Sequence, residues 1–180
     1  MLSRRSQCRL CRSNDLVAEV NFPHTIIADK YAINASTSAE RYPLDLYRCQ
    51  SCGHIQVLDI VDPNILFDSE YTYKPSRNDG LIRHFNRYAK YALNLLSYNP
   101  TNCLDIGSND GTFLSCLREQ SLTSVLGIDP AKAAASYANA NGIPTLQKFF
   151  TDQSANEILN EFGLFDIISA NNVFAHNDNL

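Results

Sequence analysis

The stretch LDIGSNDGTF, residues 104–113, places two glycines, one asparagine and two aspartates directly after a short apolar run. This composition is typical of a turn between a buried strand and a helix. A dinucleotide-binding fingerprint starting at Gly107 would also need glycine at positions 109 and 112, which hold Asn and Thr. The G-K-[ST] of a phosphate-binding P-loop is absent as well. The stretch therefore does not predict a loop that cradles phosphates.

From residue 101 onward, strand patterns alternate with helix patterns. The predicted strands are NCLDIG, VLGIDP, IPTLQKFF and FDIISANNV, and the predicted helices are DGTFLSCLREQ, AKAAASYANAN and TDQSANEILNEF. Such alternation favours right-handed βαβ crossovers and a parallel sheet. We therefore expect an α/β fold with a partial Rossmann-like sheet of four parallel strands, and we place this incomplete domain at residues 101–180.

Residues 61–100 are expected to form a connector and a long helix. The apolar residues at helical spacing are Ile82, Phe85, Ala89, Leu93 and Leu96. Asn78 and Asp79 are candidates for the N-cap, and Pro100 marks the end of the helical pattern.

Four cysteines form the pattern C-x2-C-x37-C-x2-C, at Cys8, Cys11, Cys49 and Cys52. Zinc is held by four such ligands in a tetrahedron, and a two-residue gap lets both sulfurs of a pair face one ion. The alternatives are two unrelated thiol pairs, a redox motif, or replacement of one ligand by His54. We predict a structural zinc site in a small module, residues 1–60, with a hairpin flanking the second pair.

The composition argues against several partners. The 180 residues carry a net charge of −4 with a pI of about 5.5, so no basic field attracts nucleic acid or an anionic membrane. The N-terminal arginines at positions 4, 5, 9 and 12 are interpreted as a solvated basic turn rather than a binding patch. No apolar run approaches the roughly 18 residues of a membrane span, and no secretory signal is recognisable. We expect a cytoplasmic protein with reduced thiols.

The stretch from Asp105 to Gly111 fits a different pattern, acidic-x-G-x-x-x-G, which is typical of class I methyltransferases. There the glycines let the backbone approach the methionine and ribose parts of the cofactor. Asp129 ends the second predicted strand, 22 residues after Gly107. At this position a carboxylate can accept hydrogen bonds from both ribose hydroxyls. The alternative is a helix-capping role for Asp129 before Pro130.

Taken together, CRLC, YPLDLYRCQSCGHIQ, YTYKPS, LDIGSNDGTFL, LGIDP, GIPTLQKFF and SANNVFAH resemble the sugar C-methyltransferase family. The resemblance extends from Cys8 to His176. It implies a zinc-binding module followed by a class I core that uses S-adenosylmethionine. The implied reaction is methylation of carbon 3 in a nucleotide-linked 4-keto-6-deoxy sugar, a step of deoxysugar biosynthesis.

The resemblance also implies roles for individual residues. The implied cofactor-binding residues are Asp105, Gly107, Asn109, Asp110, Gly111, Asp129, Phe150, Asn171 and Asn172. Phe150 would lie beside the adenine, with Asn171 and Asn172 near the methionine portion. His176, Tyr71 and Tyr73 are the catalytic candidates. The alternatives are an ordinary surface histidine and, for the tyrosines, packing at a domain junction.

Family members have later strands, a C-terminal domain and a main catalytic segment that would follow residue 180. We therefore expect a truncated chain, and whether it is enzymatically active by itself is left open. The other hypotheses are a zinc-containing binding module, an inactive methyltransferase remnant, and an O- or N-methyltransferase acting on a related small molecule. The sugar, the nucleotide, the acceptor atom and the oligomeric state are not determined by the sequence.

Overall fold

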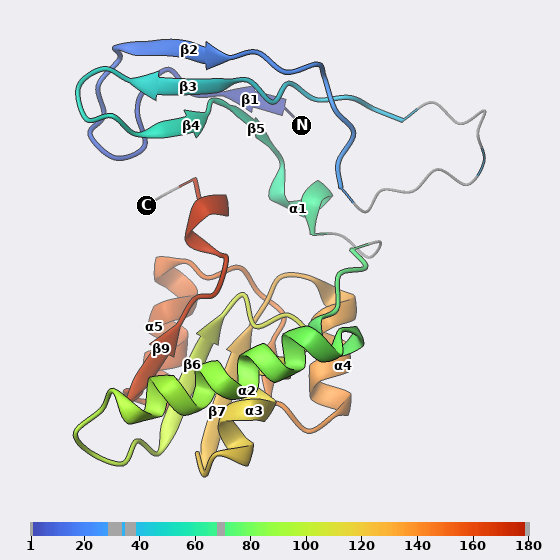
Figure 1. The fold of residues 1–180 in the computed structure, drawn as a ribbon, viewed down its shortest axis with the longest axis vertical. Helices are drawn as coiled ribbons and strands as arrows, with labels where there is room; N and C mark the ends of the chain where they lie inside the picture. The colour runs from blue at the N-terminus through green and yellow to red at the C-terminus, as the bar shows by residue number, and fades with distance from the viewer. Residues whose placement is uncertain (1, 29–33, 35–38, 68–70, 179–180) are drawn as a thin grey trace. The chain divides into compact units, whose positions relative to one another are not determined.

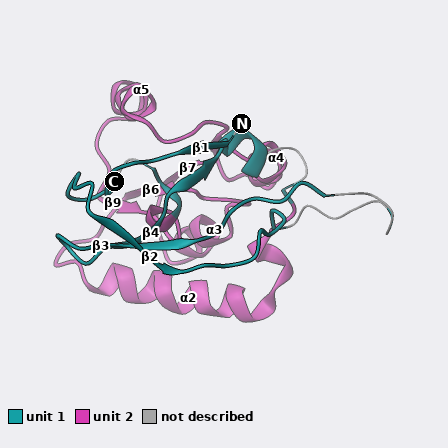
Figure 2. Ribbon diagram, turned by 90° about the horizontal axis from the view of Figure 1, so that it is seen from above, with its two compact units in different colours: residues 1–71, 176–180 teal, residues 72–175 magenta. Residues whose placement is uncertain are grey.

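The chain divides into two compact units, which are described separately. The computed structural model describes residues 2–28, 34, 39–67 and 71–178. The N-terminal unit comprises Met1–Tyr71 and His176–Leu180, and the second unit comprises Thr72–Ala175 (Figure 2).

Two small antiparallel sheets make up the N-terminal unit. One sheet has the order β2 (Leu16–Val20), β3 (Leu46–Cys49) and β4 (Ile55–Val57). In the other, β1 (Leu2–Arg4) pairs with β5 (Asp59–Val61), and the short helix α1 (Pro63–Leu66) follows. Strands β3 and β4 form the predicted hairpin around the second cysteine pair.

The second unit contains a parallel sheet of four strands. Their order is β8 (Thr145–Leu146), β7 (Ser124–Ile128), β6 (Asn102–Ile106) and β9 (Ile167–Ser169). The connecting helices are α3 (Thr112–Glu119), α4 (Lys132–Ala140) and α5 (Asp152–Phe162) (Figure 1). The predicted parallel α/β sheet is confirmed, although β8 and β9 are much shorter than the stretches from which they were predicted.

Helix α2 (Asp79–Asn94) precedes the sheet, after the 3-10 turn η1 (Pro75–Arg77). The Asn78 side chain accepts a hydrogen bond from the Leu81 N–H at 3.1 Å, so the first of the two predicted N-cap candidates is confirmed. A second 3-10 turn, η2 (Phe174–His176), follows β9.

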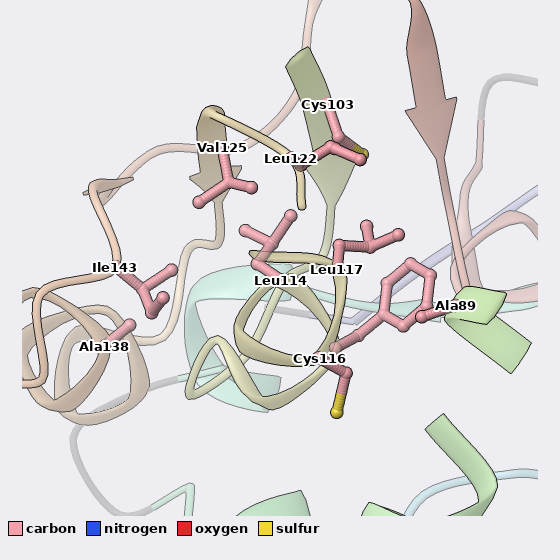
Figure 3. Packing of buried hydrophobic residues seen from close by; sticks show 10 residues of the cluster. Ala89, Cys103, Leu114, Cys116, Leu117, Leu122, Val125, Ala138 and Ile143 are labelled. Atoms are coloured by element: carbon pink, nitrogen blue, oxygen red, sulfur yellow. The ribbon is translucent and has the colours of Figure 1, made fainter. Parts of the chain in front are cut away.

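The core of the second unit has two clusters. Leu114 and Leu117 of α3 pack with Cys103 and Val125 of the sheet (Figure 3). Leu104 and Leu126, the next residues along the same strands, pack with Ile158 of α5. Because successive side chains of a strand point to opposite faces, helices cover both faces of this sheet.

A search of the described residues finds no helix that is both long and apolar enough to cross a membrane.

Candidate zinc site and cofactor crevice

The four predicted zinc ligands come together in the N-terminal unit. Their sulfur atoms all lie within 4.8 Å of one another. The Cys8 and Cys52 Sγ atoms are 3.7 Å apart, and those of Cys11 and Cys49 are 3.5 Å apart. Four sulfurs at about 2.3 Å from a zinc ion in a tetrahedron would be about 3.8 Å apart. The cluster therefore fits a closed, structural zinc site, and His54 is not part of it.

Two similar turns position the sulfurs. Each cysteine pair is followed by a residue in the left-handed region, Arg12 (φ 64°) and Gly53 (φ 78°). The Arg12 N–H donates to the Cys8 carbonyl at 3.0 Å, and the Gly53 N–H donates to the Cys49 carbonyl at 2.9 Å. The local sequence thus folds both pairs into matching knuckles.

The thiols of the cluster ionise unequally without a metal. Burial opposes ionisation of Cys49, but the backbone N–H of Cys52 and the Cys11 thiol lower the pKa of Cys49 to about 6. The backbone N–H of His54 favours the Cys52 thiolate, but the neighbouring thiols and burial raise the pKa of Cys52 to about 12, so the cluster shares a set of protons rather than presenting four ready thiolates.

In the second unit, the predicted cofactor residues gather at the carboxyl ends of the parallel strands. Strand β6 is paired with β7 so that Ile106 lies opposite Ile128, and with β9 so that Asp105 lies opposite Ser169. The chain leaves these strands at Gly107, Asp129 and the Asn171–Asn172 pair. This edge is where ligands bind in open α/β sheets.

The glycine loop turns through left-handed residues, but the reason for its glycines differs from our expectation. A Cβ on Gly107 (φ 68°) would lie 2.5 Å from Val173 Cγ2, and one on Gly111 (φ 77°) 2.9 Å from Ile143 Cγ2. The space opposite each glycine is therefore filled by a protein side chain. Conformation and internal packing explain both glycines without a cofactor.

Asp129 has a structural role at this edge. Its Oδ2 accepts from the Asn109 N–H and its Oδ1 from the Ala131 N–H, both at 2.8 Å. Burial raises the pKa of Asp129. Each carboxylate oxygen has capacity for a second donor. Asp129 thus fixes the glycine loop and the turn before α4, but the N-cap of α4 is Ala131 and receives no side-chain cap, so the helix-capping alternative is not observed. Capacity remains for hydrogen bonds from the ribose hydroxyls, and that role stays a prediction.

Asp110 is bound within the protein through both oxygens. Its Oδ1 accepts from the backbone N–H of Thr112 at 3.2 Å and from the Thr112 hydroxyl at 2.5 Å, while its Oδ2 accepts from the Ser76 N–H at 3.0 Å. It thereby fixes the start of α3 and the turn η1. A direct cofactor contact for Asp110 remains a prediction.

Asp105 lies buried beneath the same edge. Ser169 Oγ donates to its Oδ1 at 2.6 Å. Burial raises the pKa of Asp105 to about 7, although the side chains of Ser169 and Asn171 favour the charged form. Asn171 Nδ2 is buried and close enough to Asp105 to favour its charge, but it makes no hydrogen bond of regular geometry with a described residue. The donor could therefore also meet a ligand oxygen.

A hollow of about 330 Å³ adjoins Asn171. The sequence did not predict that α2 would line it. It is lined by Leu81, His84, Phe85, Tyr88, Asn171 and Asn172. The His84 and Tyr88 rings lie nearly parallel, at 10°. From the sequence, this part of α2 was predicted only as a helix with an apolar stripe. The polar residue His84, beside that stripe, was the signal that could have indicated a binding site.

The remaining candidates are more dispersed. The side chain of Phe150 is 38% exposed and that of Tyr73 is 50% exposed. Tyr71 packs edge-on against Phe67, with 5.6 Å between ring centroids, and His176 is exposed. Tyr71 and His176 belong to the N-terminal unit, whereas Tyr73 belongs to the second. The roles of all four residues remain predictions.

Comparison with known families gives two matches. Residues 8–67 match a zinc binding domain, and residues 77–180, more than half of the chain, match a methyltransferase domain. The chain belongs to the methyltransferase domain family. These matches and the cysteine cluster confirm the predicted union of a zinc module with a methyltransferase core. They also confirm its two cofactors, zinc and S-adenosylmethionine.

Among curated proteins, the chain is similar to the C-methyltransferase NovU of Streptomyces niveus, with 27% identity over 173 residues. The aligned region covers 94% of this chain and 41% of the relative, so the chain spans about two fifths of that protein's length.

Among solved structures, the chain is similar to the plantazolicin methyltransferase BpumL in complex with SAH. The identity is 21%, the TM-score is 0.44, and the match covers 58% of this chain and 40% of the other. A structure of BamL with a triazolic desmethylPZN analog and SAH has 25% identity and a TM-score of 0.34, covering 48% of this chain and 32% of the other.

Proposed function

We propose that this chain is the zinc-binding and cofactor-binding part of a C-methyltransferase that acts on a nucleotide-linked 4-keto-deoxysugar. The observation that carries the proposal is the similarity to a C-methyltransferase across the zinc module and the methyltransferase core together. The donor, when bound, supplies a methyl group activated by its sulfonium.

The residues of the sheet edge would divide the work. Asp129 would accept hydrogen bonds from the ribose hydroxyls, and the buried amide of Asn171 would donate to an oxygen of the methionine portion or of the acceptor. Carbon 3 of a 4-keto sugar is acidic because its carbanion is stabilised as an enolate. His176 is our candidate for the group that removes this proton.

The test is methyl transfer by the whole enzyme of which this chain is proposed to be a part, from S-adenosylmethionine to a thymidine-diphosphate 4-keto-6-deoxy sugar. We expect a product heavier by one methyl-for-hydrogen exchange, with the new methyl on carbon 3 by NMR. A methyl on oxygen or nitrogen would instead support the alternative hypothesis of an O- or N-methyltransferase. Binding of S-adenosylhomocysteine without turnover of the sugar would contradict the sugar substrate and leave the cofactor assignment standing.

A further inference from the structure

Two arginines of the N-terminal unit hold one carboxylate. Arg5 Nη1 donates to Asp178 Oδ2 at 2.6 Å and to the Asp178 carbonyl at 3.2 Å. Arg9 Nε donates to Asp178 Oδ1 at 3.0 Å. All three residues lie in the same compact unit, and we call their contact the clasp.

The clasp corrects the interpretation of the N-terminal arginines as a solvated turn for Arg5 and Arg9, whereas Arg4 and Arg12 are exposed. Arg9 is only 8% exposed, and Arg5 Nε is buried without a partner among the described residues. The other acceptors of Arg9, Gln56 Oε1 and the Val57 carbonyl, are neutral, so Asp178 supplies the compensating charge although its side chain is 39% exposed.

Arg9 is fixed by the zinc knuckles on both sides. In sequence it lies between the ligands Cys8 and Cys11. Its backbone N–H and its Nη1 both donate to Gln56 Oε1 at 3.1 Å, and Nη1 also donates to the Val57 carbonyl. Gln56 and Val57 lie on β4, the strand that follows the second cysteine pair. An ion that joins the two pairs would hold both sides of the Arg9 site.

Asp178 lies two residues after His176, the candidate base. We propose that Arg9 is a positioning residue, which uses the zinc-fixed knuckle to hold Asp178 and so fixes the segment His176–Asp178. The part of this inference that concerns catalysis rests on the proposed function. Zinc, which the sequence assigns only a structural task, would thereby control the conformation of a catalytic segment.

The first test measures amide hydrogen exchange in the peptide containing residues 176–178. We expect faster exchange in Arg9→Lys and Asp178→Asn at unchanged zinc content, and in the wild type after chelation. Arg12→Lys is the matched control, since Arg12 follows Cys11 in the same knuckle and is exposed. If the exchange rate of this peptide in both Arg9→Lys and Asp178→Asn equals that of the wild type, the proposal is overturned.

The second test separates positioning from stability. Because small misplacements of a reacting group are costly, we expect kcat to fall at least about tenfold in Asp178→Asn, with unchanged affinity for S-adenosylhomocysteine. Asp178→Glu should recover most of the rate. Equal loss in Arg12→Lys, or an unchanged kcat beside faster exchange, would overturn the positioning role. Absence of methyl transfer by the wild type would count against the proposed function instead, and the exchange experiment would still decide the clasp.

Discussion

At the scale of single residues, Asp105 makes the stability of the second unit depend on pH. Its pKa is raised by burial to about 7, from an ordinary value of 3.8. The folded state therefore retains a proton that the unfolded chain loses between these values. The associated stability is complete below about pH 4 and is lost as the pH rises through 7.

Asp105→Asn should remove this dependence. Because Asn stays neutral and can still accept from Ser169, we expect the variant to be more stable than the wild type at pH 8 by up to about 4 kcal/mol. The difference should shrink towards pH 4. Urea denaturation at several pH values measures it. Asp166→Asn should have the opposite effect on stability. Hydrogen bonds from Thr101 lower the pKa of Asp166, so the charged form stabilises the fold, and the Asp166→Asn variant should be less stable than the wild type at pH 8. Parallel pH profiles for Asp105→Asn and the wild type would refute this account.

Gly111 and Gly142 form a pair for testing why the loop needs glycine. Their φ angles are 77° and 75°, but a Cβ would lie 2.9 Å from Ile143 Cγ2 at Gly111, whereas the nearest atom at Gly142 is Nη1 of the Arg118 side chain, at 3.9 Å. Replacement by alanine should cost about 1–2 kcal/mol at Gly142 from backbone conformation alone. Overpacking against Ile143 should add about 1–3 kcal/mol at Gly111 and nothing at Gly142. Equal losses in thermal unfolding would contradict the packing explanation.

At the scale of elements, the start of α2 depends on one side chain. Asn78→Ala removes the acceptor for the Leu81 N–H, and we expect a loss of about 1 kcal/mol in the free energy of unfolding. Asn78→Asp retains the acceptor and should be close to the wild type. If chemical denaturation gives the same loss for both substitutions, the cap is not the cause.

The elements that the sequence predicted well are those with strong local patterns. Strands β6 and β7 coincide with apolar runs in the sequence. Helix α2 coincides with apolar residues at helical spacing, preceded by the predicted N-cap residue. In contrast, IPTLQKFF suggested a full strand, but only Thr145 and Leu146 pair with β7. This strand lies at the edge of the sheet, where polar residues such as Gln147 and Lys148 gain little from pairing.

Long-range contacts explain what sequence reasoning missed. The pairing of β1 with β5 joins Leu2 to Val61, and no local pattern specifies such a partner. The clasp between Arg9 and Asp178 is another case, because each residue alone is typical of a solvated surface. The cysteine cluster was predictable because metal geometry restricts the spacing of its ligands.

At the scale of the whole molecule, the two units should respond differently to metal removal. The buried hydrophobic residues described in the N-terminal unit are Cys8, Tyr42, Cys49 and Leu58, and two of these are predicted zinc ligands. A core this small requires the metal. Chelation should abolish protection from hydrogen exchange in the N-terminal unit and preserve it in residues 102–162.

Two cysteine variants provide the matched comparison. Cys49→Ser should lower the zinc content and the order of the N-terminal unit. Cys116→Ser, at a buried thiol of the second unit, should leave the zinc content unchanged. Equal zinc content in both variants, measured by elemental analysis, would exclude Cys49 as a ligand.

Cofactor binding is proposed for the carboxyl ends of β6, β7 and β9, and this assignment is the central one. Calorimetric titration with S-adenosylhomocysteine tests it directly, using the wild type, Asp129→Asn, and Asp166→Asn as a control at the opposite end of β9. We expect binding to the wild type and to Asp166→Asn, and affinity at least about tenfold weaker for Asp129→Asn, because a charged hydrogen bond to ribose is lost. No binding to the wild type, or equal affinity in all three proteins, would contradict the account.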